Sequence, residues 1–219
     1  MRYKLVCFDF DHTLSIGKTA AEHASELLAC GSEIAAAEHA FRVGELTTWQ
    51  FTDLMAMKFR DCTPETLSIH MTSMPVVSGI ADTVKWLKAR GLRVVINTVG
   101  FRDLMLPIGE AFGFDAVSGV RLTTQNGRFT GAVSRYFPLE DKIGFARDEA
   151  AQVGAGLDHV IAIGDGLSDL PLFQNVRRTV AFNAPPSVEA QAHFAVCGQS
   201  TGILHPVFET ILSEQEARK

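Results

Sequence analysis

The chain has 219 residues, of which 47% are hydrophobic and 21% charged, as is ordinary for a globular protein of one large domain or a core with a small insert. A formal net charge of -5 argues against a nucleic-acid-binding protein, because there is no excess of Lys and Arg to meet backbone phosphates. No uninterrupted apolar run approaches the roughly 18 residues of a membrane span, and the N-terminus does not have the pattern of a secretory signal. The four scattered cysteines are typical of a reducing compartment, so we expect a cytoplasmic protein without a membrane partner.

Segments that are typical of buried strands alternate with helical segments along most of the chain. The strand-like runs cover residues 3–10, 92–99, 159–163, 180–182 and 194–197. Their apolar character is continuous rather than alternating, which indicates strands covered on both faces, as in a parallel sheet. Helical patterns begin at residue 80 and cover residues 101–112 and 139–153. We therefore expect an α/β fold built on a doubly wound, Rossmann-like parallel sheet.

Residues 15–76 break this alternation, because they contain little that is typical of a strand. The helical candidates in this stretch are residues 19–30, 33–43, 48–60 and 64–72. We interpret the stretch as a small helical cap inserted after the first strand. The expected domains are thus a core of residues 1–14 and 77–219 and a cap of residues 15–76. A later Asn126-Gly127 pair, flanked by residues 121–124 and 128–133, predicts a β-hairpin.

Oxygen-bearing side chains follow three of the expected strands. Asp9 and Asp11 follow the first, Thr98 the second, and Asp165 and Asp169 the third. In open α/β sheets ligands bind outside the carboxyl ends of the strands, so we expect these residues in one crevice. Each alone is an ordinary turn or cap residue, but clustered carboxylates repel one another unless a cation neutralises them. An oxygen-only set suits Mg²⁺.

These segments resemble the four motifs of the haloacid dehalogenase superfamily. The run from Phe8 to Leu14 is similar to its first motif, Asp-x-Asp-x-Thr; Thr98 and Lys142 resemble the second and third; and Gly164 to Asp169 resembles the fourth. A helical insert between the first two motifs is similar to the phosphoserine phosphatase-like branch. The resemblance covers nearly the whole chain.

The resemblance implies a phosphatase mechanism with a covalent intermediate. It implies that Asp9 attacks phosphorus and becomes an aspartyl phosphate, and that Asp11 acts as general acid and then as general base. It also implies that Thr98, the N–H of Gly100 and Lys142 hold the phosphoryl group. The expected reaction is hydrolysis of a small phosphorylated metabolite. A phosphotransferase that uses an alcohol acceptor and an inactive phosphate-binding module are the alternatives.

The resemblance further implies a Mg²⁺ site. Its expected ligands are Asp9, Asp165 and the main-chain oxygen of Asp11, with Asp169 as a ligand or in contact with one. A carboxylate that attacks a phosphate dianion meets repulsion, so a cation at this place has a physical reason.

The cap departs from the pattern of phosphoserine phosphatases. Lys18 stands where they carry a glutamate that reads the substrate amino group, and an ammonium cannot accept that hydrogen bond. If Lys18 faces the pocket, phosphoserine is a poor substrate; the alternative is a surface lysine. Arg42, Lys58 and Arg60 are candidates for holding a substrate carboxylate. Ser168 replaces the usual Asn of the fourth motif.

Overall fold

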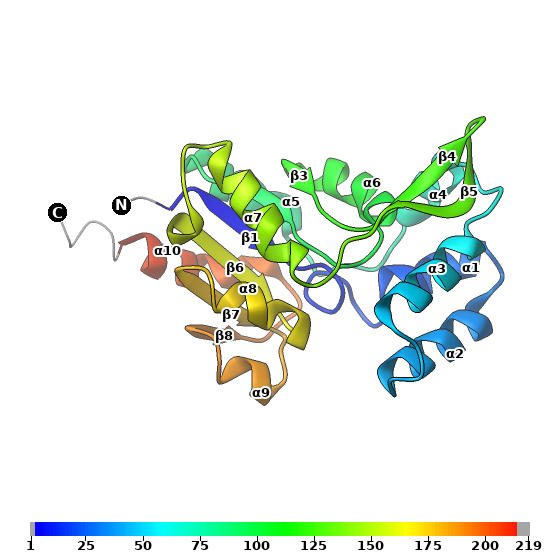
Figure 1. Cartoon of the computed structure of the whole chain (residues 1–219). Coiled ribbons are helices and arrows are strands. Elements are labelled where there is room, and N and C mark those ends of the chain that lie inside the picture. The colour runs from blue at the N-terminus through cyan, green and yellow to red at the C-terminus, as the bar shows by residue number, and fades with distance from the viewer. Residues whose placement is uncertain (1–2, 214–219) are drawn as a thin grey trace.

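A parallel sheet of six strands forms the centre of the core in the computed structural model, which describes residues 3–213 except for the side chain of Arg42 (Figure 1). The strand order is β3-β2-β1-β6-β7-β8. The strands are β1 (Leu5–Phe8), β2 (Arg93–Ile96), β3 (Ala116–Val117), β6 (Val160–Gly164), β7 (Arg178–Phe182) and β8 (Phe194–Val196). Every neighbouring pair in this sheet is parallel.

Helices cover both faces of the sheet because successive strand residues point to opposite sides. In β1, Val6 and Phe8 face one side, and Leu5 and Cys7 face the other. The helices on the first side are α5 (Ile80–Ala89), α6 (Arg102–Phe112) and α10 (His205–Ser213). Those on the second are α7 (Asp141–Ala151), α8 (Leu170–Phe173) and α9 (Pro186–Glu189). The expected doubly wound α/β fold is thus confirmed. Short 3₁₀ helices lie at η1 (Leu157–His159), η2 (Leu167–Asp169) and η3 (Thr201–Leu204).

Four helices occupy the stretch between the first two strands, as expected for a cap, and lie together at one end of the molecule (Figure 1). They are α1 (Ala20–Leu27), α2 (Gly31–Arg42), α3 (Thr48–Lys58) and α4 (Pro64–Met71). Thr19 caps α1 and forms a capping box with Glu22, and Thr47 does the same for α3 with Gln50. The domain limits at residues 15 and 76 stay a prediction.

The predicted hairpin is present, and it contacts the cap. It consists of β4 (Arg121–Gln125) and β5 (Arg128–Arg135), and Asn126 and Gly127 between them have φ angles of 51° and 75°, as the tight turn requires. Asp61 N–H donates to the oxygen of Phe129 at 2.9 Å, and Phe129 N–H donates to the oxygen of Cys62 at 2.9 Å. A segment that follows the cap by more than 40 residues in sequence thus pairs with its backbone. Among the described residues, no helix is both long and apolar enough to cross a membrane.

Candidate active site

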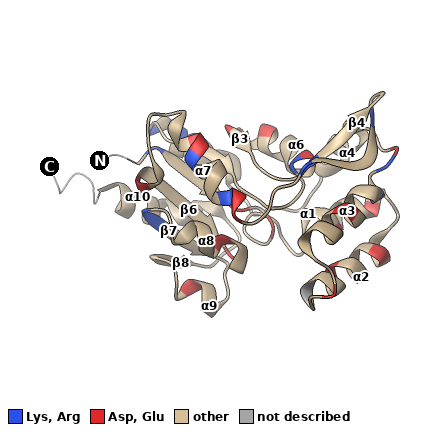
Figure 2. Ribbon diagram, viewed as in Figure 1, with Lys and Arg blue, Asp and Glu red and all other residues tan. Residues whose placement is uncertain are grey.

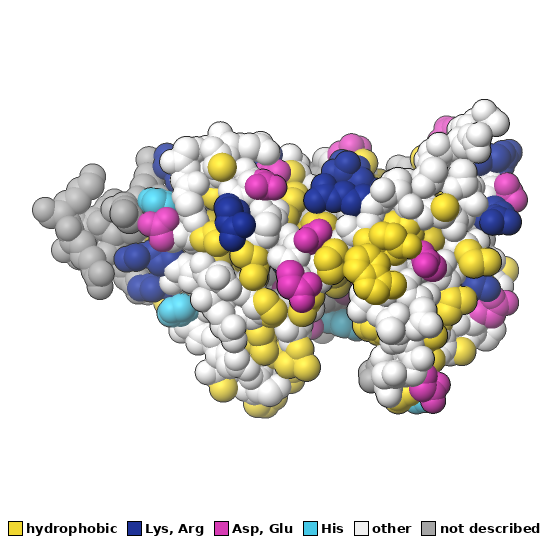
Figure 3. All heavy atoms as spheres, viewed as in Figure 1, with side chains coloured by type: hydrophobic (Ala, Val, Ile, Leu, Met, Phe, Trp, Pro, Cys, Tyr) yellow, Lys and Arg dark blue, Asp and Glu magenta, His cyan; other side chains and the backbone are white. Residues whose placement is uncertain are grey.

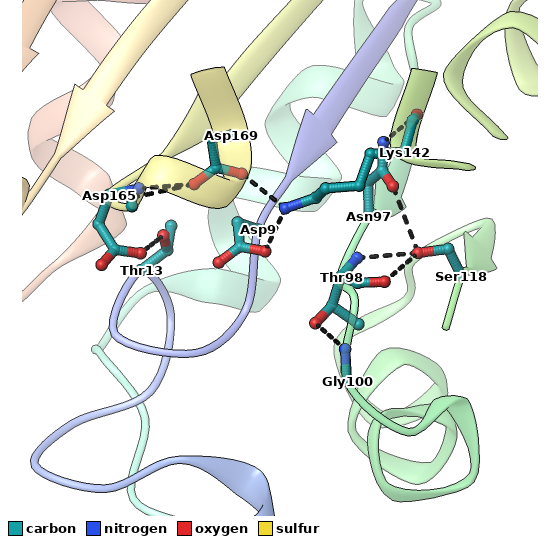
Figure 4. A network of polar contacts seen from close by, with 10 residues as sticks. Asp9, Thr13, Asn97, Thr98, Gly100, Ser118, Lys142, Asp165 and Asp169 are labelled. Carbon is teal, nitrogen blue, oxygen red and sulfur yellow. Dashed lines mark hydrogen bonds and ion pairs between the residues drawn. The ribbon is translucent and has the colours of Figure 1, made fainter. Parts of the chain in front are cut away.

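The carboxyl ends of β1, β2 and β6 meet at one place on the sheet edge. β1 pairs with β2 on one side and with β6 on the other, so the strand order reverses direction beside β1. This reversal opens a crevice at the strand ends. Asp9, Thr98 and Asp165 leave the three strands there and lie around a common centre (Figure 4). Figure 2 shows further acidic residues at the start of α7 and beside α8, next to this crevice.

A buried lysine stands at the centre of the crevice. Lys142 lies in the first turn of α7 and is 0% exposed. Its Nζ donates to Asp9 Oδ1 at 2.7 Å and to Asp169 Oδ1 at 2.6 Å. Burial alone would lower the pKa of Lys142, but the charges and hydrogen bonds of Asp9 and Asp169 outweigh it and raise the pKa. Lys142 therefore stays an ammonium and binds the two carboxylates together.

Asp169 is fixed by its backbone surroundings as well as by Lys142. Its second oxygen, Oδ2, accepts the N–H groups of Asp165 and Gly166, both at 3.1 Å. The carboxylate also lies against Gly164, where an added Cβ would come within 2.2 Å of it. Only glycine leaves room for the carboxylate there. Both oxygens of Asp169 are engaged, which suits a residue that orients Lys142 and the loop.

Asp9, Asp165 and Asp169 form a cluster whose carboxylate oxygens lie within 4.8 Å of one another. Three carboxylates face one ammonium, so an excess of negative charge remains in a largely buried place. Burial raises the pKa of Asp9 well above its usual range, the charge of Asp169 adds to the rise, and Lys142 opposes it. A hard divalent cation would remove this conflict, and oxygen ligands are what Mg²⁺ prefers. The donor set therefore fits the metal dependence that we expected, with Asp9 and Asp165 better placed as ligands than Asp169.

Asp11 lies beside this cluster and outside it. Its Oδ1 accepts the N–H of Ala20, the first residue of α1, at 2.7 Å. Loss of hydration raises the pKa of Asp11 to about 6, although the Ala20 N–H works against the rise. This direction is the one that a proton donor at neutral pH requires. Because the bond joins Asp11 to the cap, the position of the carboxyl group depends on where α1 begins.

The loop after β2 is held by residues that the sequence motifs did not single out. The hydroxyl of Ser118, which follows β3, accepts the N–H of Thr98 and lies 2.8 Å from the Thr98 oxygen. Asn97 Nδ2 donates to the main-chain oxygen of Lys142 at 2.9 Å and so ties β2 to α7. Thr98 Oγ1 accepts the N–H of Gly100 at 3.0 Å. Thr98 and Gly100 thus lie close together, on the side of the crevice that faces Lys142 (Figure 4).

Thr13, like Ser118, holds a loop of the site in position. It is the threonine of the first motif, and its hydroxyl donates to Asp165 Oδ1 at 2.6 Å. The bond connects the loop after β1 to the loop after β6. Its place in the motif was a signal in the sequence, whereas nothing in the sequence pointed to Ser118.

A cavity of about 330 Å³ extends from Asp11 and Gly100 between core and cap. Most of its side chains are apolar, namely Ala20, Ala21, Phe41, Phe51, Val99, Phe101, Leu104, Met105, Val120, Phe137 and Leu139. Its acids are Asp11 and Glu38, and Ser168 also lines it. No Lys, Arg or His side chain occurs in the described part of this lining. Figure 3 shows hydrophobic side chains at the surface along the junction of the two lobes.

Lys18 and Arg42 were the two residues expected to influence substrate choice, and the structure describes the side chain of Lys18 but not that of Arg42. Lys18 Nζ lies 2.6 Å from Glu26 Oε1 on α1, and Lys18 is not part of the cavity lining. That Lys18 meets the substrate stays a prediction, although Glu26 engages its ammonium in this structure. The backbone of Arg42 ends α2 beside the cavity residue Phe41, but its side chain lies outside the described part of the structure.

The family described as haloacid dehalogenase-like hydrolase matches residues 6–174. The chain belongs to this family. It is 28% identical over 194 residues to phosphoserine phosphatase of Methanocaldococcus jannaschii, covering 88% of this chain and 92% of that protein. It is 27% identical to phosphoserine phosphatase SerB2 of Mycobacterium tuberculosis, with 95% of this chain aligned to 49% of that protein.

The fold of this hydrolase is also found in a solved structure. A phospho-aspartyl intermediate analogue of phosphoserine phosphatase aligns with a TM-score of 0.75 and 24% identity, covering 93% of this chain and 98% of the other. The expected membership of the haloacid dehalogenase superfamily, and with it an enzyme of the hydrolase class, is confirmed.

Gly164→Ala should weaken the site because its Cβ would collide with the carboxylate of Asp169. We expect turnover to fall at least about tenfold, since removal of a group that orients metal ligands typically costs roughly 10–100-fold. The matched control is Gly144→Ala on α7, where an added Cβ meets nothing within 4 Å. Steady-state kinetics and circular dichroism of both variants test this. Normal turnover of a folded Gly164→Ala protein would contradict the account of Asp169.

Proposed function

We propose that this hydrolase is a Mg²⁺-dependent phosphatase that cleaves small phosphomonoesters through an aspartyl phosphate on Asp9. The observation that carries the proposal is the pairing of Lys142 Nζ with Asp9 at 2.7 Å inside a cluster of three carboxylates. The excess of negative charge at this site favours binding of a cation. The bound cation would in turn bind an anionic phosphoryl group. The relatives named phosphoserine phosphatase support the reaction class.

The nucleophile has the features that the first step needs. Oδ1 of Asp9 is held by Lys142, and among the described residues no hydrogen bond engages Oδ2. An oxygen of Asp9 attacks phosphorus, the bond from phosphorus to the alcohol oxygen breaks, and the phosphoryl group is transferred to Asp9. Lys142 offsets the repulsion between the attacking carboxylate and the phosphate. Thr98 and the N–H of Gly100 are near enough to one another to bind phosphoryl oxygens together.

Asp11 would handle the proton in both steps. In the first it gives its proton to the departing alcohol oxygen. In the second it takes a proton from water as the water oxygen attacks phosphorus and the bond to Asp9 breaks, which releases inorganic phosphate. Its carboxyl group borders the cavity, where the alcohol would be bound. Asp9 and Asp165 would hold Mg²⁺, which when bound neutralises charge on Asp9 and on the phosphoryl oxygens.

The cavity favours an alcohol without a carboxylate. Its described lining is largely apolar, with the acids Asp11 and Glu38 and no cation to pair with an anionic group. A buried carboxylate without a partner is strongly disfavoured, whereas the aromatic rings of Phe41 and Phe51 can bind an ammonium through a cation–π interaction. We therefore propose a substrate whose alcohol is apolar or carries an amine. The sequence-based role of Arg42 in holding a carboxylate stays a prediction that competes with this one.

Asp9→Asn should abolish turnover and leave the fold intact, because it removes the attacking charge and preserves the shape. Asp11→Asn should slow turnover by roughly 10²–10⁴-fold, the usual contribution of proton transfer. Phosphate release from an aryl phosphate measures both. A near-normal rate in Asp9→Asn would refute the mechanism. Adding alcohols and searching for their phosphorylated products decides between hydrolysis and phosphotransfer.

Removal of divalent metal by a chelator should abolish activity, and Mg²⁺ should restore it. Ca²⁺ should inhibit, because it takes more ligands at longer distances and would displace the Asp9 carboxylate. Rates measured after chelation and after each addition test the prediction. Full activity in the metal-free protein would show that the carboxylate cluster has another purpose.

Phosphoethanolamine should be hydrolysed with a higher kcat/KM than phosphoserine, because the two differ only in the carboxylate for which the described cavity offers no cation. We expect at least about a tenfold preference, the equivalent of roughly 1.4 kcal/mol. Efficient phosphoserine hydrolysis that Arg42→Met abolishes would instead assign carboxylate recognition to Arg42.

A further inference from the structure

A pair of histidines in the cap has no part in the proposed reaction. His23 of α1 and His70 of α4 stack with ring centroids 4.4 Å apart and planes 15° from parallel. His23 is 4% exposed, and His70 is partly exposed. The pair therefore joins two cap helices at a place that solvent reaches from the His70 side.

The hydrogen bonds of the two rings fix where each ring carries its proton. His70 Nε2 lies 2.8 Å from the main-chain oxygen of His23, and His23 Nε2 lies 3.2 Å from the main-chain oxygen of His70. A carbonyl oxygen only accepts, so each Nε2 is the nitrogen that carries hydrogen. In the neutral rings each Nδ1 is then left with a lone pair. Metal-binding histidines are oriented in this way, with the other nitrogen donating to a carbonyl.

The Nδ1 of His23 is buried and has no hydrogen-bond partner among the described residues. A buried polar atom without a partner is costly, so its presence calls for a ligand or another explanation. The nearest charged atom is Oε2 of Glu26, at 3.5 Å. Glu26 is three residues after His23 on α1, so the two side chains share one face of the helix.

One ring nitrogen each of His23 and His70 and one carboxylate oxygen of Glu26 lie within 4.8 Å of one another. Ligands about 2.0–2.2 Å from one ion span up to roughly 4 Å, so binding has to draw the set together. The rings are 15° from parallel, so the partly exposed His70 ring has to turn out of the stack before both histidines point a lone pair at one ion. Lys18 competes for Glu26, since its ammonium holds Glu26 Oε1 at 2.6 Å. Glu26 has a second oxygen on the side of His23.

We propose that His23, Glu26 and His70 form a second metal site, which binds a transition-metal dication such as Zn²⁺. Two imidazole nitrogens and one carboxylate suit Zn²⁺, whereas Mg²⁺ prefers the all-oxygen set around Asp9. The ion would brace α1 against α4. Because α1 begins at Ala20, whose N–H holds Asp11, the brace would also steady the cap side of the active site.

Calorimetric titration with ZnCl₂ in excess Mg²⁺ tests the site. The titrations use a Cys197→Ser background, because Cys197 is an exposed thiol and thiolate sulfur is a ligand that Zn²⁺ favours. We expect the protein to bind one Zn²⁺ per chain, and Asp165→Asn should leave this binding unchanged. His70→Ala and Glu26→Gln should abolish the binding or lower its affinity at least about tenfold. Lys18→Met should tighten binding, by up to roughly fivefold, because exposed ion pairs like that of Lys18 with Glu26 contribute little. His39→Ala, at an exposed histidine of α2, is the matched control and should change nothing.

Neither His70 nor Glu26 is fully buried, so His70→Ala and Glu26→Gln should fold. Loss of Zn²⁺ binding in these variants and its persistence are therefore both informative. Zn²⁺ binding that persists unchanged in His70→Ala and Glu26→Gln would overturn the proposal, as would a wild-type protein that binds no Zn²⁺ in excess Mg²⁺. Zn²⁺ should also raise the melting temperature of the wild type and not of His70→Ala. Loss of binding in Asp165→Asn alone would assign the ion to the active-site carboxylates instead.

Discussion

The ion pairs of Lys142 are the interaction on which the site depends. Its buried ammonium joins Asp9 at the end of β1 to Asp169 after β6, and its own main-chain oxygen binds Asn97 at the end of β2. One residue of α7 thus contacts residues at the ends of three strands around the crevice. Removing one partner of such a buried set typically costs about 3–5 kcal/mol, because the remaining charges lose their compensation. The core therefore depends on the same charges as the proposed chemistry.

The excess of carboxylates over cations gives the site its function. A fold that only needed stability would not leave Asp9, Asp165 and Asp169 within 4.8 Å of one another with one ammonium between them. Burial raises the pKa of Asp165 as it does that of Asp9, so the cluster is strained until further positive charge arrives. A bound cation would reduce this excess of negative charge and would then attract the anionic phosphoryl group, which favours binding the two together.

The sequence predicted the core and its strand ends because both follow from local patterns. Continuous apolar runs predicted the buried strands, and a parallel sheet brings their carboxyl ends to one edge, so Asp9, Thr98 and Asp165 were expected to meet. The Asn126-Gly127 turn was predicted for the same reason, since its φ angles follow from residue type. Short elements such as β3 and α9 have too few residues to show a periodic pattern of apolar side chains, so the sequence did not indicate them.

Contacts between distant segments were beyond the sequence. Ser118, which follows β3, supports Thr98 from 20 residues away in sequence, and no local pattern indicates such a pairing. Lys18 stands where phosphoserine phosphatases carry a glutamate that reads the substrate, but its ion pair with Glu26, eight residues further along the chain, forms only in the folded protein. The pairing of the hairpin with Asp61 and Cys62 likewise arises only when cap and core are packed. Contacts of this kind form only when distant segments pack together, so they leave no local pattern in the sequence.

The central claim is that phosphate is transferred to Asp9. The most direct measurement is rapid acid quench of the enzyme during turnover of a ³²P-labelled substrate, followed by peptide mapping. The account predicts a label that hydroxylamine releases and that maps to the peptide containing Asp9. It also predicts that the label is absent from Asp9→Asn and from metal-free protein. A label on another residue, or turnover without any labelled enzyme, would contradict the account.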